Sequence, residues 1–306
     1  MTALSIGVLG LGAWGQTLSD LFSRQGHQIK VWSRRSGGSP LEAIRAVDLV
    51  LVAVSLAGSK QLATDLAGDW DLRVPLLSCS KGLDPETQLT ASQIWQAANP
   101  ELNPLVLSGP NLATELAQGC PAASVLAGVE LDRVQQLQRQ LSSDQLRLYA
   151  SADPLGVELA GALKNVMAIA AGICDGLKLG ANAKASLLCR GMAEMGLVIQ
   201  NLGGEQGSLY GLAGLGDLLA TANSPLSRNY RFGLALAGGA SASEAQASVG
   251  ATVEGFKTAQ AVAALGERHG WSLPICQQVV RTADGRSSPQ EAVHALMQRS
   301  LRDEQA

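Results

Sequence analysis

Hydrophobic residues in the first half of the chain form short runs that alternate with amphipathic segments of helical period. The uninterrupted run DLVLVAV at 48–54 is typical of a strand buried on both faces of a parallel sheet. Further strands are predicted at 4–9, 28–32, 74–78, 105–107, 122–126 and 146–149. Helices are predicted between them at 15–24, 61–66, 86–97 and 131–141. This alternation predicts a doubly wound α/β sheet with right-handed crossovers.

The pattern changes at Asp153-Pro154, a capping aspartate followed by a proline suited to the first helical position. Beyond it, the spacing of apolar residues predicts helices and no strand. The predicted helices are 155–174, 185–203, 228–236, 252–268 and 289–299. The Ala- and Ser-rich segment 240–248 is expected to be a surface loop with a poorly specified helix. We therefore expect an α/β domain at 1–152, followed by an all-α domain at 153–306.

The amino-acid composition is that of a folded globular protein. Of 306 residues, 46% are hydrophobic and 16% are charged, so the chain can bury sizeable cores and intrinsic disorder is excluded. The net charge of −3 argues against a nucleic-acid partner, because proteins that bind nucleic acids usually carry a basic excess.

The cysteines and the amino terminus bear on the compartment. Five scattered cysteines without a C-x-x-C pair predict neither a disulfide framework nor a structural zinc site, and no metal is expected. Buried thiols in a reducing compartment are expected instead. No basic segment precedes an apolar run at the amino terminus, and no stretch of about 18 apolar residues lacks charge. We expect a cytoplasmic protein without a signal peptide or stable membrane insertion.

The first predicted strand ends in GLGAWG at 10–15, which has the spacing G-x-G-x-x-G and opens the next helix. In this context the motif is typical of dinucleotide binding in a Rossmann-type domain. Gly10 would form the tight turn, Gly12 would let the backbone approach the pyrophosphate, and Gly15 would pack helix against sheet. A glycine-rich turn without a ligand is the alternative. Trp14 either lines the cofactor site or packs in the core.

Two arginines, Arg34 and Arg35, follow the second predicted strand. An acidic residue at this place binds the ribose 2′-hydroxyl of NAD, whereas arginine suits the 2′-phosphate of NADP. The pair therefore predicts NADPH as the cofactor, with NADH still usable. An exposed basic turn without such a role is the alternative.

Two lysines are candidates for chemistry. Lys164 interrupts an apolar helix at GALKNV, 161–166. A buried lysine is destabilising unless it is paired or functional, and burial lowers its pKa toward the range useful for proton transfer. Alternatively, its ammonium group extends along the helix to solvent. Lys81 follows the fourth predicted strand, at the carboxyl edge of the sheet where such folds bind ligands.

A glycine-dense segment, GLAGLGD at 211–217, is expected to form a loop that ends in the carboxylate of Asp217. Further along, Ser227 is a suitable N-cap for a helix that starts at Arg228, with Asn229 next. Backbone N–H groups, a hydroxyl, a guanidinium and an amide in one place would suit a phosphate group. An ordinary capped helix with a solvated arginine is the alternative.

Taken in order, these motifs closely resemble the NAD(P)-dependent glycerol-3-phosphate dehydrogenase family of bacterial type, over essentially the whole chain. The set comprises GLGAWG at 10–15, Lys81-Gly82, SGPNLA at 108–113, GALKNV at 161–166, GLAGLGD at 211–217, Ser227-Arg228-Asn229 and VEG at 253–255. The resemblance implies interconversion of dihydroxyacetone phosphate and sn-glycerol 3-phosphate, which supplies phospholipid synthesis. It implies a small phosphorylated substrate as the partner, and the sequence is compatible with a homodimer.

The resemblance also implies roles for the matched residues. Lys164 matches the catalytic lysine of the family, and Lys81 matches a lysine near both substrate and nicotinamide. The implied substrate-binding residues are Lys81, Gly109, Asn111, Lys164, Asp217, Ser227, Arg228 and Asn229. The cofactor-binding residues, from the motif and the resemblance together, are Gly10, Gly12, Trp14, Gly15, Arg34, Arg35, Lys81, Ala113, Arg228 and Glu254.

The chain departs from the family pattern at several places. The segment 36–47 is shorter than in relatives, which removes most of a helix and loop near the adenine side and puts the strength of cofactor binding in doubt. Relatives commonly carry Ser or Thr at the position of Asn111. They often carry Thr at the position of Cys189.

Two other functions are compatible with parts of this pattern. One is a related oxidoreductase that acts on a 3-hydroxy acid or an imine, which a comparison of phosphorylated and unphosphorylated substrates would distinguish. The other is an NADP-binding regulator without turnover, which would bind cofactor but reduce no dihydroxyacetone phosphate.

Overall fold

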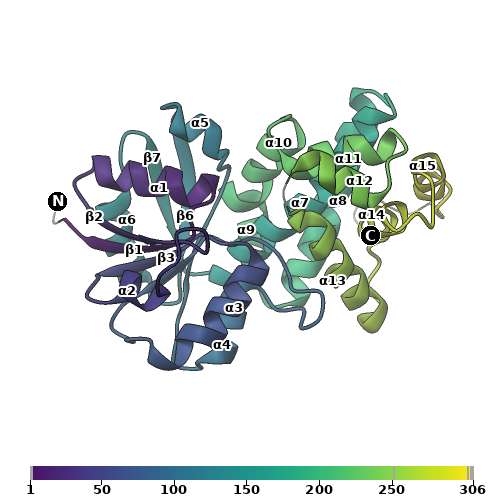
Figure 1. Cartoon of the computed structure of the whole chain (residues 1–306). Coiled ribbons are helices and arrows are strands. Elements are labelled where there is room, and N and C mark those ends of the chain that lie inside the picture. The colour runs from purple at the N-terminus through teal and green to yellow at the C-terminus, as the bar shows by residue number, and fades with distance from the viewer. Residues whose placement is uncertain (1–2, 251, 302, 304–306) are drawn as a thin grey trace.

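A seven-stranded sheet occupies one half of the molecule and a group of helices the other half (Figure 1). The computed structural model describes residues 3–250, 252–301 and 303. The strands are β1 (Ser5–Leu9), β2 (Gln28–Trp32), β3 (Leu49–Val52), β4 (Leu76–Ser78), β5 (Leu105–Ser108), β6 (Ala122–Ala127) and β7 (Leu146–Ser151). Their order in the sheet is β2-β1-β3-β4-β5-β6-β7. The predicted α/β half of the chain is confirmed.

The sheet is not parallel throughout. Neighbouring strands from β2 to β5 pair in parallel, but β6 pairs antiparallel with β5 and parallel with β7. The expected doubly wound arrangement is therefore correct for β1 to β5 and is corrected for β6 and β7. The one helix between β5 and β6, α5 (Ala113–Ala117), spans only five residues, which is too short to return along the full length of a strand.

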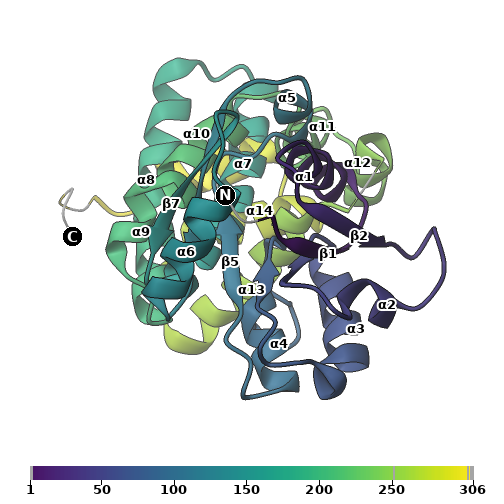
Figure 2. The ribbon, with the colours of Figure 1, turned by 90° about the vertical axis from the view of Figure 1, so that its left-hand side faces the viewer.

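Helices cover both faces of the sheet, as Figures 1 and 2 show. Besides α5, they are α1 (Ala13–Arg24), α2 (Pro40–Ile44), α3 (Leu56–Leu66), α4 (Ala91–Ala98) and α6 (Leu131–Leu141). On one face, α1, α5 and α6 pack through side chains such as Phe22 and Leu137. On the other face, α2, α3 and α4 pack through side chains such as Leu62 and Trp95. The five-residue helices α2 and α5 were not predicted, because they are too short to show a hydrophobic period.

Helix α4 begins later than the predicted start at 86. Asp84 accepts hydrogen bonds from the backbone N and the Oγ1 of Thr87, at 2.9 and 3.0 Å, which hold the preceding segment in a turn. Thr90 then caps the helix in a capping box with Gln93. Local side-chain bonds thus compete with the helix before Ala91.

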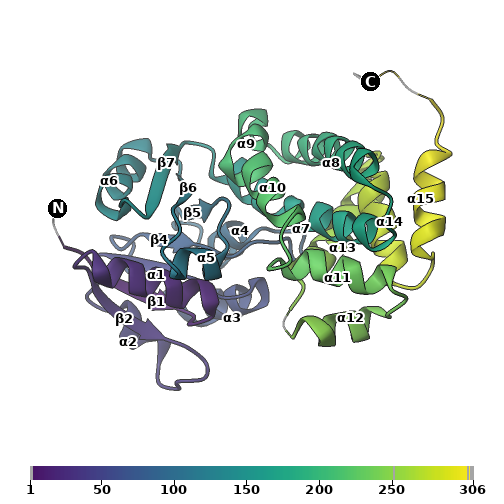
Figure 3. The same cartoon turned by 90° about the horizontal axis from the view of Figure 1, so that it is seen from above.

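The second half consists of helices and the loops that join them, and no strand follows β7 among its described residues. Its helices are α7 (Pro154–Gly176), α8 (Ala181–Asn201), α9 (Gln206–Tyr210), α10 (Asp217–Ala222), α11 (Arg228–Ala237), α12 (Ala242–Val249), α13 (Glu254–His269), α14 (Pro274–Ala283) and α15 (Pro289–Met297). Helices α9, α10 and α14 were not predicted. The segment 240–248, expected to be a surface loop with a poorly specified helix, contains most of α12, because Ser241 and Glu244 make a capping box there. Figures 1 and 3 both place α15 at the end of the molecule farthest from the sheet.

Helix α7 is the centre of the second half. All its residues from Gly156 to Cys174 are buried. By length and composition it could cross a membrane, but its most apolar stretch is entirely buried inside the protein. It is therefore a core helix, with α8, α10, α11 and α13 packed around it.

All five cysteines are free. Cys79, Cys174 and Cys276 are buried, as expected, whereas Cys120 and Cys189 are exposed. The expectation of buried thiols is therefore wrong for these two, which lie at the surface after α5 and on the outer side of α8.

Candidate active site

The glycine motif lies at the end of β1 and opens α1. Gly10 has a φ of +107°, a conformation that L side chains rarely adopt. A Cβ on Gly15 would lie 1.9 Å from the carbonyl oxygen of Gly10, whereas a Cβ on Gly12 would meet nothing within 4 Å. The space beside Gly12 is therefore open at the N-terminus of a 12-residue helix, an arrangement that fits the pyrophosphate of a dinucleotide.

Two further predicted cofactor residues lie near this loop: Trp14, within the motif itself, and Ala113, at the start of α5. The hydroxyl of Thr17 on α1 donates to the carbonyl oxygen of Ala13 at 2.8 Å and also lies 3.4 Å from the carbonyl oxygen of Ala113, so the start of α5 lies against α1. Trp14 is half-buried and packs against the hydrophobic cluster of the sheet. Its packing matches the core alternative, and its contact with a cofactor stays a prediction.

Arg34 and Arg35 occupy the two central positions of a turn after β2. The N–H of Ser36 donates to the carbonyl oxygen of Ser33 at 3.1 Å, which closes the turn. Both arginines are exposed. The turn follows β2, which is an edge strand of the sheet, so both arginines lie at that edge in contact with solvent.

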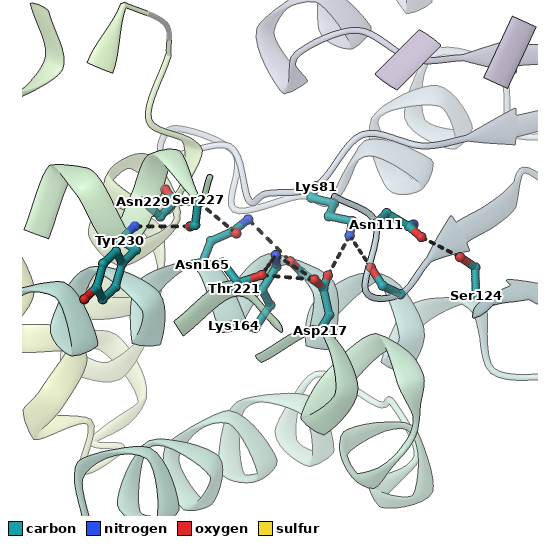
Figure 4. A network of polar contacts seen from close by, with 12 residues as sticks. Lys81, Asn111, Ser124, Lys164, Asn165, Asp217, Thr221, Ser227, Asn229 and Tyr230 are labelled. Carbon is teal, nitrogen blue, oxygen red and sulfur yellow. Dashed lines mark hydrogen bonds and ion pairs between the residues drawn. The ribbon is translucent and has the colours of Figure 1, made fainter. Parts of the chain in front are cut away.

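An ion network joins the two halves of the molecule (Figure 4). Lys164, on α7, donates to Oδ1 of Asp217 at 2.9 Å. Lys81, in the loop after β4, donates to Oδ2 of the same carboxylate at 2.6 Å and to the carbonyl oxygen of Gly109 at 3.1 Å. One aspartate thus holds two lysines that come from different halves of the chain.

Burial determines the proton affinities in this network. Lys164 is 6% exposed, so it does not extend to solvent. Burial lowers the pKa of Lys164 to about 8, although the Asp217 carboxylate acts in the opposite direction. Burial would raise the pKa of Asp217, but the charges of Lys164 and Lys81 outweigh it and hold that pKa below its usual range. Lys164 is thereby able to exchange a proton near neutral pH.

The segment expected to be a glycine loop, 211–217, is helical instead. Leu212–Gly216 form a π-helical turn that leads directly into α10. A Cβ on Gly214 would lie 2.0 Å from the carbonyl oxygen of Leu209, so glycine is needed for this close packing. The turn directs Asp217 toward α7.

Thr221 is a site residue that the sequence analysis missed. Its Oγ1 accepts a hydrogen bond from Lys164 at 2.6 Å and donates to Asp217 at 3.1 Å. It lies one helical turn after Asp217 on α10, and this i, i+4 spacing is the signal that could have identified it.

Ser227, Arg228 and Asn229 form the first turn of α11 and its cap. Ser227 accepts a hydrogen bond from the N–H of Tyr230, as predicted for an N-cap. Asn229 is buried, donates to Asn165 at 2.9 Å and accepts from the N–H of Gly255 at 3.0 Å. Arg228 is exposed. If a phosphate group binds at this turn, its available partners are the Arg228 guanidinium and the backbone N–H groups. The Asn229 side chain instead links α11 to α7 and α13.

Glu254 also joins the two halves. Its Oε1 accepts a hydrogen bond from the N–H of Leu56, at the start of α3, at 3.3 Å. Burial raises the pKa of Glu254 to about 7, against the opposing effects of the Leu56 N–H and of the Arg228 and Lys257 charges. A cavity of about 50 Å³ lies beside Glu254 and is also lined by Leu56 and Lys257.

The segment after β5 carries Gly109 and Asn111. Gly109 has a φ of +154° and packs against Ser124, whose Cα would be 2.9 Å from an added Cβ. Ser124 donates to Oδ1 of Asn111 at 2.6 Å. Nδ2 of Asn111 and Oγ of Ser108 are buried, and neither has a hydrogen-bond partner within the described part of the chain. Orphaned buried polar groups of this kind are costly, and each one in a native structure calls for an explanation.

Within the described residues, no group of three or more His, Cys, Asp or Glu side chains is placed to hold a metal ion. The side chains that meet in this region present ammonium, carboxylate, hydroxyl and amide groups.

Two protein-family models match this chain. Residues 5–40 and 37–133 match the model of the NAD-dependent glycerol-3-phosphate dehydrogenase N-terminus. Residues 153–294 match the model of the NAD-dependent glycerol-3-phosphate dehydrogenase C-terminus. Together the two models span most of the chain.

Individual proteins agree as well. The glycerol-3-phosphate dehydrogenase (NAD(P)+) of Synechococcus sp. (strain RCC307) is 57% identical over 302 residues, which cover 99% of this chain and 100% of that protein. The crystal structure of glycerol-3-phosphate dehydrogenase from Coxiella burnetii has a TM-score of 0.92 and 33% identity, and the match covers 97% of this chain and 99% of that one. A ketopantoate reductase from Ralstonia eutropha, with a TM-score of 0.59 and 14% identity, shares the fold alone.

Proposed function

The chain belongs to the NAD-dependent glycerol-3-phosphate dehydrogenase family, and we propose how its residues carry out the reaction of that family. It is an oxidoreductase that interconverts dihydroxyacetone phosphate and sn-glycerol 3-phosphate with NADPH or NADH. The reaction would supply glycerol 3-phosphate for phospholipid synthesis. The observation that carries the assignment of roles is the buried network of Lys164, Asp217 and Lys81.

The cofactor is proposed to bind across the N-terminus of α1. Gly10, Gly12 and Gly15 shape the space for its pyrophosphate, and the N-terminus of the helix favours the negative charge. NADPH supplies the hydride when bound. Ala113 lies beside this loop, and Glu254 holds the start of α3 nearby.

Lys164 is proposed to be the general acid. It donates a proton to the carbonyl oxygen of dihydroxyacetone phosphate as hydride adds to the carbonyl carbon, which gives the alcohol. Asp217 orients the Lys164 ammonium group, and Lys81 places a second positive charge near the oxygen that becomes negative. In the reverse reaction, neutral Lys164 accepts the proton from the alcohol.

The phosphate of the substrate is proposed to bind at the first turn of α11. Arg228 supplies a guanidinium there, the turn that Ser227 caps supplies backbone N–H groups, and Asn229 holds this turn against α7 and α13. Anchoring the phosphate away from the carbonyl provides binding energy that can position the reacting group. Gly109 and Asn111 complete the substrate site on the side of the sheet.

Replacing Arg228 with alanine should chiefly weaken substrate binding. Hydrogen bonds to charged groups contribute about 1.5–3 kcal/mol, so kcat/KM for dihydroxyacetone phosphate should fall by roughly 10- to 100-fold. Steady-state kinetics would measure this loss. Reduction of unphosphorylated dihydroxyacetone serves as the control and should change little. Unchanged kcat and KM for the phosphorylated substrate would place the phosphate elsewhere.

Replacing Arg34 and Arg35 together with alanine should raise KM for NADPH much more than for NADH. The arginines attract the 2′-phosphate, which NADH lacks. Because both side chains are exposed, salt screens them, and the NADPH preference of the wild type should shrink at high ionic strength. The exposed Arg45, at the end of α2, provides a matched control in Arg45→Ala. Equal losses with both cofactors would show that the pair does not recognise the 2′-phosphate.

An absorbance assay of cofactor oxidation with dihydroxyacetone phosphate, run with NADPH and NADH in parallel, tests the function as a whole. An imine or 3-hydroxy acid reductase would reject the phosphorylated substrate. A cofactor-binding regulator would bind NADPH without oxidising it in the presence of this substrate.

The organisation of the chain is part of the proposal. We propose a dinucleotide-binding domain at 1–152 and a catalytic domain at 153–306, supported by the change from strands to helices at β7 and α7.

We propose a soluble cytoplasmic protein, supported by the burial of α7. A homodimer is also proposed, supported by the exposed apolar side chains of Tyr210, Leu219 and Leu226, and sedimentation would test it.

A further inference from the structure

The loop that carries Lys81 is fixed to the catalytic half of the molecule at more than one point. This loop joins β4 to α4. Its Leu83 is fully buried in the hydrophobic cluster around α7. The N–H of Leu83 donates to Oγ1 of Thr258, on α13, at 3.4 Å. The position of Lys81 therefore depends on how the loop and α4 dock against the catalytic half.

Glu158 makes the attachment at the far end of the loop. It lies on α7 and is 1% exposed. Its Oε1 accepts a hydrogen bond from the backbone N–H of Ser92 at 3.0 Å, and its Oε2 accepts one from the hydroxyl of Ser92. Thr90 and Gln93 already cap α4 by a capping box, so Glu158 is an additional cap that comes from the other half of the molecule. A carboxylate at this position is also favoured by the dipole of α4.

Glu158 and Lys164 are on the same helix, six residues apart. That spacing corresponds to about 9 Å along a helix. Lys164 meets Lys81 at the shared carboxylate of Asp217. Helix α7 thus carries Lys164 into the site. Through Glu158, the same helix also holds α4, which lies at the end of the loop that carries Lys81.

We propose that Glu158 is a positioning residue, which keeps Lys81 at the substrate carbonyl by fixing the N-terminus of α4 to α7. This inference rests on the proposed function, because it assigns to Lys81 a part in that reaction. It requires that Glu158 acts through Lys81 and not through the stability of the protein in general.

Removing the carboxylate should release this attachment. In Glu158→Ala, the first turn of α4 loses its link to α7, and the loop that presents Lys81 is held to the catalytic half only through Leu83 and through the bond of Lys81 to Asp217, so we expect Lys81 to shift relative to Lys164. A misplacement of about 1 Å by a change away from the chemistry can lower the rate about 10²-fold. We expect a loss of that order in kcat/KM for dihydroxyacetone phosphate, with little change in KM for NADPH.

A double-mutant cycle between Glu158→Ala and Lys81→Ala tests the inference. If Glu158 acts through Lys81, Glu158→Ala should lower kcat/KM about 10²-fold in the wild type and less than about threefold when Lys81 is already alanine. A loss of equal size in both backgrounds would overturn the inference, and so would the absence of a loss in the wild-type background.

Conservative and matched variants keep the test independent of folding. Glu158→Gln keeps one oxygen for the Ser92 N–H, and its amide can donate to the Ser92 hydroxyl, so it should retain activity close to wild type. Ser92→Ala removes only the hydroxyl and should give a smaller loss of the same kind, which provides the cycle if Glu158→Ala does not fold. Glu194 also caps a helix from a distance, accepting from the N–H groups of Ile275 and Cys276 at 2.6 and 3.1 Å. As the matched control, Glu194→Ala should lower thermal stability without changing kcat/KM.

The wild-type assay separates this inference from the proposed function. A wild-type protein that reduces no dihydroxyacetone phosphate would overturn the proposed function and the inference with it. An active wild type whose Glu158 and Lys81 variants have additive effects would overturn the inference alone.

Discussion

Replacing Lys164 with alanine should lower the rate of dihydroxyacetone phosphate reduction by roughly 10²–10⁴-fold, the usual contribution of a general acid. Lys164 is buried, bonded to Asp217 and Thr221, and able to lose its proton near neutral pH. The glycine loop at 10–15 lies on a different element, so NADPH should still bind. Steady-state kinetics and NADPH titration of the folded variant measure the two effects.

The pH dependence of the wild type gives a second measurement of the same role. Because the pKa of Lys164 is about 8, the reduction, which needs the protonated lysine, should slow as pH rises through that value. Oxidation of glycerol 3-phosphate needs the neutral lysine and should speed up over the same range. Lys184, a partly exposed lysine paired with Asp175 at 2.6 Å, gives the control variant Lys184→Ala. A folded Lys164→Ala protein with more than about a tenth of the wild-type rate would contradict the assignment, since the expected loss is far larger.

Replacing Asp217 with asparagine should damage both stability and activity. The change leaves the Lys164 and Lys81 ammonium groups without the carboxylate that each contacts, at 2.9 and 2.6 Å. Removing one partner from a buried ion pair destabilises a protein by about 3–5 kcal/mol. The pKa of Lys164 should also fall further, because burial and the neighbouring positive charges are then unopposed. At pH 7 the rate of reduction should fall at least about 10²-fold, the lower end for loss of a general acid.

Thermal unfolding and pH profiles would measure these two effects separately. The Asp217→Asn profile for reduction should move to lower pH, a shift that loss of stability alone does not produce. Asp175 supplies a matched control, since it contacts Lys184 and the Tyr230 hydroxyl, each at 2.6 Å. Asp175→Asn should leave the pH profile where it is. An unshifted profile in Asp217→Asn would show that this carboxylate does not set the protonation of Lys164.

Several features of the protein could be determined from the sequence because they depend on neighbouring residues. Buried strands such as 48–54 show as branched apolar runs, and β3 forms there. The glycine motif at 10–15 shows its turn chemistry directly, and Gly10 has the positive φ that this requires. The Asp153-Pro154 start of α7 and the Ser227 cap of α11 are local bonds between residues a few positions apart.

Other features were decided by tertiary packing. Lys164 and Asp217 are 53 positions apart, and Lys81 and Asp217 are 136 apart, so no local pattern reveals that one carboxylate serves both lysines. The sequence left open whether Lys164 reaches solvent, and only the helices packed around α7 decide that it does not. The π-helical turn before Asp217 also depends on packing against another element, since Gly214 lies against the carbonyl oxygen of Leu209 in α9. Hydrophobic period and turn chemistry are properties of adjacent residues, whereas burial, proton affinity and the meeting of distant side chains are properties of the packed chain.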